Sequence, residues 1–169
     1  MDIRTETPAD FDAVHAVHTE AFAPSAVEAK LVDDLRAEGA LVTDLCLVAT
    51  EGDAVIGHIA YSRATLDPSG HEILVLAPMG VLPEYQRQAV GMQLIGQSMR
   101  RAVLTDYPLV SVLGHPEYYP RFGFGPARPL GIDPPFDVPD AAWMARKLPR
   151  YTDEAKGTVR YAQAFDAAV

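Results

Sequence analysis

The stretch from Ile73 to Val103 constrains the fold more than any other part of the chain. Its first part, Ile73–Val81, is nearly all apolar, as a central strand buried on both faces is. A polar turn follows, and from Val90 onward apolar residues recur at the spacing of one helix face. A buried strand that leads through a short turn into an amphipathic helix predicts a protein in which helices pack on a sheet.

The remaining elements follow from patterns of the same kind. Thr7 and Pro8 are expected to start a helix that runs to Phe22, and Ser25 to cap a second helix that ends before Gly39. Further strands are expected at Ile3–Thr5, Leu41–Thr50, Ala54–Tyr61, Leu109–Leu113 and Trp143–Leu148, with a proline-rich loop over 126–139. This order predicts a mixed α/β fold, and the length of 169 residues fits a single domain spanning 1–169.

Composition limits the partners and the compartment. The formal net charge of -9 argues against nucleic acid and against an anionic membrane surface, because both are bound through clustered Lys and Arg. No apolar run approaches the roughly 20 residues of a membrane span, and the N-terminus lacks the pattern of a signal peptide. Cys46 is the only cysteine, and no Cys/His group has metal-ligand spacing. We therefore expect a cytoplasmic protein that binds no metal.

The turn between the predicted strand and helix is the first candidate site. A helix start leaves backbone N–H groups without partners and carries the positive end of the helix dipole. Small residues at Ala89 and Gly91 let an anion approach these groups, and Gln86 and Arg87 add donors. The pattern fits a phosphate site, although an ordinary helix start with Gly91 packed against the sheet explains the spacing equally well.

An aromatic segment that follows the predicted strand Leu109–Leu113 is the second candidate site. Most of its rings are expected to form a packing cluster. One tyrosine hydroxyl can still face a pocket and act as a proton donor. The ring-bearing residues of this segment are His115, Tyr118, Tyr119, Phe122 and Phe124.

Together the two segments resemble the GNAT superfamily of N-acetyltransferases. The resemblance rests on Gln86-x-x-Ala89-x-Gly91 and on Tyr119-Pro120-Arg121-Phe122-Gly123-Phe124, which bracket one helix and one strand. Within the superfamily the chain is similar to a bacterial branch of small predicted acetyltransferases with a Tyr-Tyr-x-Arg-Phe-Gly-Phe signature. The resemblance covers Ile3 to Leu148. It implies a single-domain α/β (α+β) GNAT fold, whose central, mostly antiparallel sheet is splayed at the cofactor site and flanked by helices.

The resemblance implies a coenzyme site at the predicted turn. The first motif matches the superfamily's (Gln/Arg)-x-x-Gly-x-(Gly/Ala), whose backbone amides hold the pyrophosphate of coenzyme A. Acetyl-CoA is thus the implied co-substrate, with its pantetheine arm paired along the strand that ends at Val81 and a bulge expected at Pro78. The implied cofactor-binding residues are Met79, Val81, Gln86, Arg87, Gln88, Ala89, Val90, Gly91 and Met92.

Three positions depart from the family pattern. Ala89 replaces the first motif glycine, and we expect it to be tolerated because alanine fits helical backbone angles. Gly114 stands where many relatives carry an asparagine. Val75 stands where some relatives carry a glutamate base, so this strand is expected to supply no such base.

The implied catalytic residues are Tyr119 and His115. Tyr119 lies four residues before Gly123, at the position of the tyrosine that protonates the departing thiolate; the alternative is that its ring only packs. His115 is a candidate base for the amine, directly or through water, or else a cap on the turn that begins at Pro116. The other histidines of the first half, expected to be structural or exposed, are His15, His18 and His58.

The implied reaction is direct transfer of the acetyl group from acetyl-CoA to a primary amine without a covalent enzyme intermediate. Cys46 lies far in sequence from both motifs and is not expected to act as a nucleophile. The acceptor is expected to be a small-molecule or peptide amine, and the protein a monomer or homodimer. Glu28 and the aspartates of the 126–140 loop are candidates to line the acceptor site, or else lie on the solvated surface. The alternative is a non-catalytic module that binds or senses acyl-CoA or an acyl carrier, which Ala89 and the missing strand glutamate favour. Turnover of acetyl-CoA with an amine separates the two.

Overall fold

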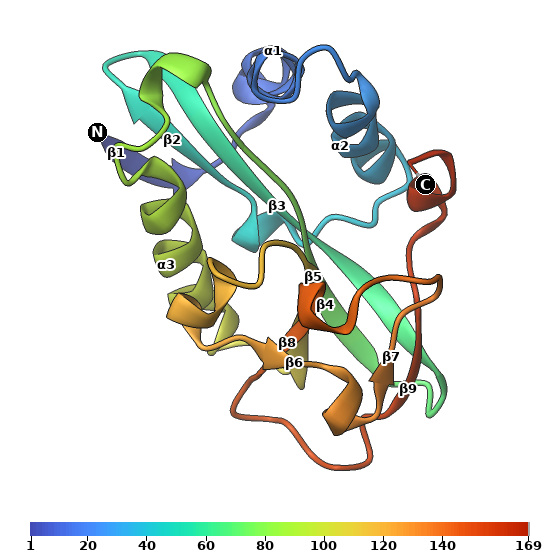
Figure 1. Ribbon diagram of the computed structural model, residues 1–169. Helices are drawn as coiled ribbons and strands as arrows, with labels where there is room; N and C mark the ends of the chain where they lie inside the picture. The colour runs from blue at the N-terminus through green and yellow to red at the C-terminus, as the bar shows by residue number, and fades with distance from the viewer. Residues whose placement is uncertain (169) are drawn as a thin grey trace.

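The long strands β3 and β4 form the middle of a mixed sheet (Figure 1). In the computed structural model, which describes residues 1–168, nine strands join this sheet in the order β1-β2-β3-β4-β5-β8-β6, with β9 beside β3 and β7 beside β9. Among these pairs only β4–β5 and β7–β9 are parallel. The strands are β1 (Asp2–Thr5), β2 (Leu47–Glu51), β3 (Ala54–Pro68), β4 (Glu72–Val81), β5 (Leu109–Leu113), β6 (Gly125–Pro126), β7 (Ile132–Asp133), β8 (Trp143–Lys147) and β9 (Gly157–Arg160).

Helices cover both faces of the sheet: α3 lies on one face, and α1 and α2 lie on the other (Figure 1). Alternate side chains of β4 serve the two faces. Leu74 and Leu76 pack in the core with α3, whereas Ile73 and Val75 pack in the core with α2. This double burial explains the apolar run of the strand, and the mostly antiparallel, helix-flanked sheet confirms the predicted fold class. The helices are α1 (Phe11–Ala21), α2 (Val27–Ala37) and α3 (Val90–Ala102).

Local contacts determine where the first two helices begin. Thr7 and Asp10 form a capping box across the 3-10 turn that leads into α1. Arg4 donates two hydrogen bonds to the Asp10 carboxylate, at 2.7 and 2.9 Å, and this contact holds the pKa of that carboxyl well below its usual range. The Ser25 hydroxyl accepts a hydrogen bond, at 3.2 Å, from the N–H of Val27, the first residue of α2.

Two predicted strands differ from the observed ones. The prediction of a strand at Leu41–Thr50 is wrong over its first half, because Thr43–Leu45 forms a 3-10 turn and, apart from an isolated bridge between Leu41 and Ser62, pairing begins with β2. Cys46 therefore lies just before β2, fully buried, and burial raises the pKa of its thiol to about 12. β3 runs past the predicted end at Tyr61 as far as Pro68, because its last four residues pair with β9.

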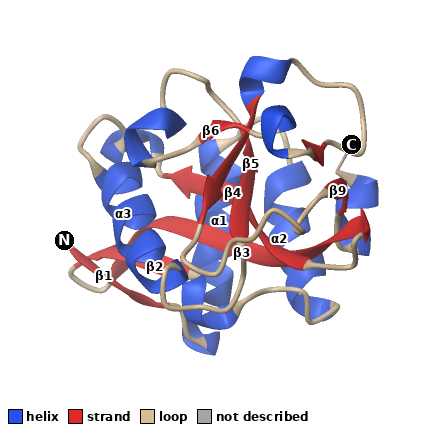
Figure 2. Cartoon of the chain, turned by 90° about the horizontal axis from the view of Figure 1, so that it is seen from below, coloured by secondary structure: helices blue, strands red, loops and turns tan. Residues whose placement is uncertain are grey.

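β4 and β5 lie side by side in the middle of the sheet and separate towards their C-terminal ends (Figure 2). They pair only at Leu74 with Val110 and at Val75 with Ser111. Beyond these pairs the main chain of β4 faces a gap. The register of β4 against β3 shifts at Pro78, which confirms the predicted bulge. The sheet is therefore splayed at the end of β4, next to the turn that leads into α3.

The C-terminal part of the chain returns to α2 (Figure 1). A 3-10 helix at Gln163–Ala167 lies against α2, and the Glu38 carboxylate accepts a hydrogen bond from the N–H of Ala164 at 2.7 Å. This segment follows β9, which joins the sheet through the far end of β3. Residues that are distant in sequence from α1 and α2 are thus brought beside them.

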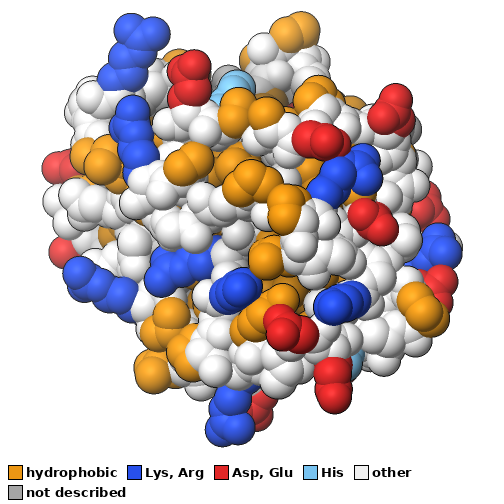
Figure 3. Space-filling view, turned by 60° about the horizontal axis from the view of Figure 1, so that its bottom comes forward, with side chains coloured by type: hydrophobic (Ala, Val, Ile, Leu, Met, Phe, Trp, Pro, Cys, Tyr) orange, Lys and Arg blue, Asp and Glu red, His pale blue; other side chains and the backbone are white. Residues whose placement is uncertain are grey.

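The surface mixes side chains of all kinds. On the face shown in Figure 3, lysine and arginine side chains are scattered among acidic and apolar ones. That face therefore presents no continuous basic area of the sort that binds a phosphate backbone. Among residues 1–168, no helix combines the length and the apolar character that crossing a bilayer requires.

Candidate active site

A cavity of about 1120 Å³ opens where β4 and β5 separate. The end of β4, the turn after it, the start of α3 and the aromatic segment after β5 all contribute to its wall. Three of its lining residues, Val27, Met92 and Leu113, are large apolar side chains that are 42, 44 and 43% exposed. Apolar side chains left open to solvent around one hollow are typical of a ligand site.

Every predicted site residue except Gln88 lines this cavity. Gln88 instead donates a hydrogen bond from Nε2 to the carbonyl oxygen of Glu84, at 2.9 Å. Nε2 of Gln86 donates in the same way to the carbonyl oxygen of Val81, at 3.1 Å. The two glutamines thus brace the backbone of the turn. The predicted residues on the wall are Met79, Val81, Gln86, Arg87, Ala89, Val90, Gly91, Met92, His115 and Tyr119.

Ala89 has a left-handed backbone, with φ 66° and ψ 12°. The prediction that it takes helical angles is therefore wrong, because Ala89 precedes α3 as its N-cap. Arg87 is left-handed as well, with φ 62°. This conformation costs an L-residue roughly 1–2 kcal/mol, and the strand and helix on either side of the turn enforce it. Left-handed residues at a turn direct successive N–H groups to one side, a geometry that binds anions.

The start of α3 presents free backbone donors to the cavity. Within α3, Gln93 is the first residue whose N–H donates to a main-chain carbonyl oxygen, that of Ala89 at 3.0 Å. The N–H groups just before it are those that a helix start leaves without an intrahelical partner. Gly91 adds no side chain here, and a Cβ at this position would lie 3.1 Å from the hydroxyl of Tyr118. Free donors and the positive end of the helix dipole therefore coincide, as a pyrophosphate requires.

Tyr118 and Tyr119 both line the cavity, although neighbouring residues of a helical turn are expected to point apart. Their rings meet edge to face, with centroids 5.2 Å apart. Tyr119 is 9% exposed and packs on Phe124, and burial raises the pKa of its hydroxyl to about 12. Tyr118 is half-buried, and burial raises the pKa of its hydroxyl too. Both hydroxyls therefore remain protonated at neutral pH and can donate.

Gly114 provides the space that the ring of Tyr119 occupies. A Cβ at position 114 would lie 2.3 Å from Cε2 and 2.9 Å from Cδ2 of Tyr119. Any side chain here would displace the ring. The glycine in place of the family's asparagine is thus coupled to the position of the tyrosine.

Comparisons with known proteins identify the family of the chain. A family model described as an acetyltransferase (GNAT) domain matches residues 2–127. The chain belongs to the GNAT acetyltransferase family. The uncharacterised N-acetyltransferase YjhQ of Escherichia coli K12 is 36% identical over 159 residues, which cover 90% of this chain and 87% of the relative.

Two crystal structures resemble this GNAT acetyltransferase over nearly its whole length. The Escherichia coli GNAT N-acetyltransferase YhbS, in complex with CoA, has a TM-score of 0.87 at 31% identity, covering 98% of this chain and 91% of that chain. A GNAT acetyltransferase from Brucella melitensis, in complex with acetyl-CoA, has a TM-score of 0.81 at 30% identity, covering 98% of this chain and 97% of that chain. The family predicted from the two motifs is therefore confirmed.

His115 of this GNAT acetyltransferase lies on the cavity wall with an exposed side chain. Its carbonyl oxygen accepts the N–H groups of Tyr118 and Tyr119, at 3.1 and 3.3 Å, so the backbone of His115 closes the turn. The imidazole is therefore available to the cavity. Val75 also lies on the wall and brings no carboxylate.

A buried pair of histidines lies behind β4. His18 of α1 and His58 of β3 are fully buried, with Nε2 of His18 2.9 Å from Nδ1 of His58. Nε2 of His58 lies 3.1 Å from Oε2 of Glu6, outside the geometry of a straight hydrogen bond, and Arg36 pairs with the same carboxylate at 3.1 Å. Burial, and secondarily the neighbouring His58, lower the pKa of His18 to about 3. His18 is therefore neutral at pH 7.

Gly80 lets the His18 ring approach β4. A Cβ at position 80 would lie 2.8 Å from Nδ1 of His18. Both histidines are fully buried, which excludes the exposed alternative predicted for them, but no spacing rule predicts the contact between residues 40 apart.

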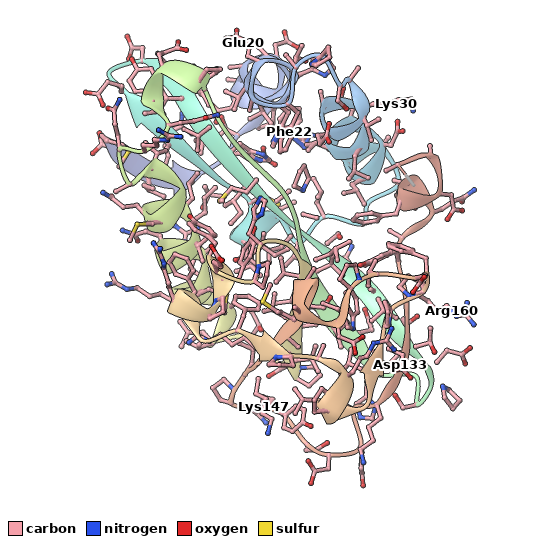
Figure 4. All side chains as sticks on the ribbon, viewed as in Figure 1. Glu20, Phe22, Lys30, Asp133, Lys147 and Arg160 are labelled. Atoms are coloured by element: carbon pink, nitrogen blue, oxygen red, sulfur yellow. The ribbon has the colours of Figure 1, made fainter. Side chains whose placement is uncertain are left out.

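Glu28, a candidate for the acceptor site, lines the part of the wall beside α2, whereas the aspartates of the 126–140 loop do not line the cavity. The aromatic residues of this part of the wall, which the sequence does not single out, are Phe22, Phe136, Tyr161 and Phe165. Figure 4 shows Phe22 on the inner side of α1, whereas Glu20 points away from the molecule. The four-residue spacing of Tyr161 and Phe165 is the one signal that indicates a shared face.

Proposed function

We propose that this protein transfers the acetyl group of acetyl-CoA directly to a primary amine. The observation that carries the proposal is the single cavity in which the gap between β4 and β5, the anion-binding turn and two tyrosine hydroxyls meet. Relatives at 30 and 31% identity were crystallised with acetyl-CoA and with CoA. Their likeness over nearly the whole chain supports the same ligand here.

In this proposal the coenzyme is held mainly by backbone groups. The free N–H groups at the start of α3 and the side chain of Arg87 bind the pyrophosphate. The open edge of β4 beyond Val75 takes the pantetheine arm as an added strand. The same cavity wall continues to Tyr118 and Tyr119, which supports a role for their hydroxyls in the transfer of the acyl group.

The chemistry needs a polarised carbonyl, a neutral amine and a proton for the leaving sulfur. The amine nitrogen attacks the thioester carbon, the C–S bond breaks, and the thiolate departs. The N–H of Val81 or its neighbour polarises the carbonyl oxygen. Tyr119 supplies the proton to sulfur, since its raised pKa keeps the hydroxyl protonated until then. The proton of the amine passes to His115 or to water at the cavity wall.

Cys46 supports transfer without a covalent intermediate. It is the only cysteine of the chain and it is fully buried before β2. Its raised pKa leaves no thiolate at neutral pH, and the thiolate is the nucleophilic form. Direct attack by the amine therefore fits the residues around the cavity better than an acyl-cysteine.

Thermal unfolding and thiol release test the proposal in two steps. Acetyl-CoA is expected to raise the melting temperature, because a ligand that binds only the folded state stabilises it. ADP, which lacks the pantetheine arm, is expected to raise it much less. No shift at millimolar acetyl-CoA overturns the proposal. A shift without thiol release for any amine favours the non-catalytic acyl-CoA-binding alternative.

A further inference from the structure

Part of the cavity wall is built by the α1–α2 region, the loop after β7 and the C-terminal segment, and it differs in character from the proposed coenzyme region at the end of β4 and the start of α3. We call this part the acceptor wall, and its members are Phe22, Glu28, Leu31, Phe136, Tyr161 and Phe165. Five of the six present aromatic or aliphatic groups. None of them belongs to the motifs from which the family was predicted.

The aromatic members of the acceptor wall support one another. Tyr161 and Phe165 stack with ring centroids 4.6 Å apart and an interplanar angle of 26°. Phe136 adds a third ring, 6.2 Å from that of Tyr161. Burial raises the pKa of the Tyr161 hydroxyl, so this group is uncharged at neutral pH. The rings offer a fixed, uncharged surface on which an apolar body can pack.

Glu28 supplies the only carboxylate among the lining residues that the structure describes. The Ser25 hydroxyl donates a hydrogen bond to Oε2 of Glu28 at 2.8 Å, which orients the carboxylate. Oε1 remains for a ligand. Val27, which is 42% exposed, keeps the surface around the carboxylate apolar. One fixed negative charge beside an aromatic surface is complementary to one ammonium group.

From this arrangement we infer that the acceptor is a primary monoamine whose amino group is carried by an aromatic body. The inference rests on the proposed acetyl transfer and names its substrate class. The rings hold the aromatic body, and Glu28 attracts and orients the ammonium form as it arrives. The proton then leaves to water or to His115, and the neutral amine attacks.

The same arrangement disfavours two other classes of amine. A polyamine carries several ammonium groups, and the lining offers one carboxylate to balance them. A free amino acid carries a carboxylate, which Glu28 would repel. The cationic side chains on the wall, Arg87 and Arg121, belong to the turn before α3 and to the aromatic segment.

The experiment compares amines in a thiol-release assay at saturating acetyl-CoA. Phenethylamine is the aromatic monoamine, hexylamine the aliphatic one, spermidine the polyamine, and phenylalanine carries the aromatic body together with a carboxylate. We expect kcat/KM for phenethylamine to exceed the values for spermidine and phenylalanine by at least about 10-fold, because unpaired or repelled charges in a site are strongly disfavoured. Equal or faster turnover of spermidine overturns the inference.

Two variants test whether the acceptor wall causes the preference for phenethylamine. Glu28→Gln is expected to raise KM for phenethylamine roughly 10-fold with little change in kcat, because it removes binding common to ground and transition states. Glu20→Gln removes the same charge from an exposed position outside the cavity and is expected to change nothing. Phe136→Ala is expected to reduce the preference for phenethylamine over hexylamine. An unchanged KM in Glu28→Gln overturns the role of the carboxylate.

Direct binding separates failure of this inference from failure of the proposed transfer. In the presence of CoA, phenethylamine is expected to raise the melting temperature of the wild type more than that of Glu28→Gln. Such a shift without any thiol release would support the subsite and refute the transfer. Thiol release with spermidine alone would support the transfer and refute the inference. No shift with phenethylamine also refutes the inference.

Discussion

The two parts of the cavity are built by different means. The coenzyme region comes from one continuous stretch, the end of β4 through the start of α3, and its donors are mainly backbone N–H groups. The acceptor wall comes from the α1–α2 region, from the loop between β7 and β8 and from residues beyond β9, and it acts through side chains. A site formed by backbone groups keeps its ligand when side chains are substituted. A site formed by side chains changes its ligand preference when those side chains are substituted.

The residues that the family model matches differ between these two parts of the cavity. The family model covers residues 2–127, which contain the whole coenzyme region. Phe136, Tyr161 and Phe165 lie outside that range. The matched part of the chain therefore contains the proposed coenzyme region, and the acceptor wall is completed by residues that lie outside the match.

The largest expected effect tests whether the coenzyme region is where we place it. Ala89→Asp sets a carboxylate at the N-cap of α3, beside the proposed pyrophosphate. A repulsion of about 4 kcal/mol, typical of two charges 4 Å apart near a protein surface, corresponds to roughly a thousandfold loss of acetyl-CoA affinity. Calorimetric titration measures it.

Ala9→Asp is the matched control for that substitution. It adds the same charge at an exposed position of the 3-10 turn before α1, away from the cavity, and is expected to leave acetyl-CoA affinity unchanged. If Ala89→Asp binds acetyl-CoA as the wild type does, the pyrophosphate site lies in another turn.

The next effect concerns the aromatic segment that joins the two parts. Tyr119→Phe keeps the ring and its packing, and it is expected to lower kcat by roughly ten- to a thousandfold, within the usual range of general-acid contributions. Acetyl-CoA affinity is expected to stay the same. Thiol release at saturating acetyl-CoA gives kcat, and titration gives the affinity.

Tyr107→Phe is the control for the loss of a hydroxyl. Tyr107 packs at the margin of the same apolar cluster and does not line the cavity, so no change is expected. Tyr118 is unsuitable as a control because its hydroxyl lies near Gly91 on the cavity wall. A damaging Tyr118→Phe together with a silent Tyr119→Phe would transfer the acid role to Tyr118.

The two parts of the cavity also differ in how well the sequence predicts them. The buried strand, the polar turn and the amphipathic helix are local patterns, so the coenzyme region and the splayed sheet follow from them and from the family resemblance. Short strands such as β6 and β7 have two residues each and exist only through their partners. No local pattern predicts them, and Phe136 and Phe165 reach the cavity only through that long-range pairing.

Backbone conformation sets the second limit on prediction. Ala89 follows a turn and precedes a helix, and its spacing is compatible with either left-handed or helical angles. The alanine itself favours the helical choice, which is why that prediction is wrong. The His18–His58 contact is hidden for another reason, because α1 and β3 meet only in the folded chain.

A third prediction concerns the pH dependence of stability, which tests whether His18 of α1 stays buried against the central strands. The pKa of His18 is about 3 in the folded protein and roughly 6.5 in an unfolded chain. The unfolded state therefore binds more protons in mild acid, and the free energy of unfolding falls as the pH drops below 6.5. The slope is at most about 1.4 kcal/mol per pH unit. Chemical denaturation between pH 7 and pH 5 measures it.

Two variants test whether His18 is the group that causes this slope. His18→Gln removes the buried titrating group and is expected to flatten the profile, whereas Ala16→Gln, at an exposed position of α1, removes no titrating group and is expected to keep the wild-type slope. Asp10, whose pKa is lowered by Arg4, loses its contribution only below the ordinary carboxyl pKa of about 4 and stays outside this window. An identical slope in wild type and His18→Gln would show that His18 is not buried and neutral.

The smallest expected effect separates backbone strain from ligand contact in the coenzyme region. Ala89 is left-handed, so Ala89→Gly is expected to raise the free energy of unfolding by about 1 kcal/mol, since glycine takes this conformation freely. Ala26→Gly is the matched control: Ala26 is the N-cap of α2 with φ -104°, where glycine relieves no strain and only loosens the unfolded chain. Acetyl-CoA affinity is expected to be equal or slightly higher in Ala89→Gly, because the backbone donors stay and a methyl group leaves. Urea unfolding and calorimetric titration of both variants measure the two quantities. A loss of stability in Ala89→Gly would mean that position 89 takes helical angles after all, and a loss of affinity would mean that the methyl group itself contacts the coenzyme.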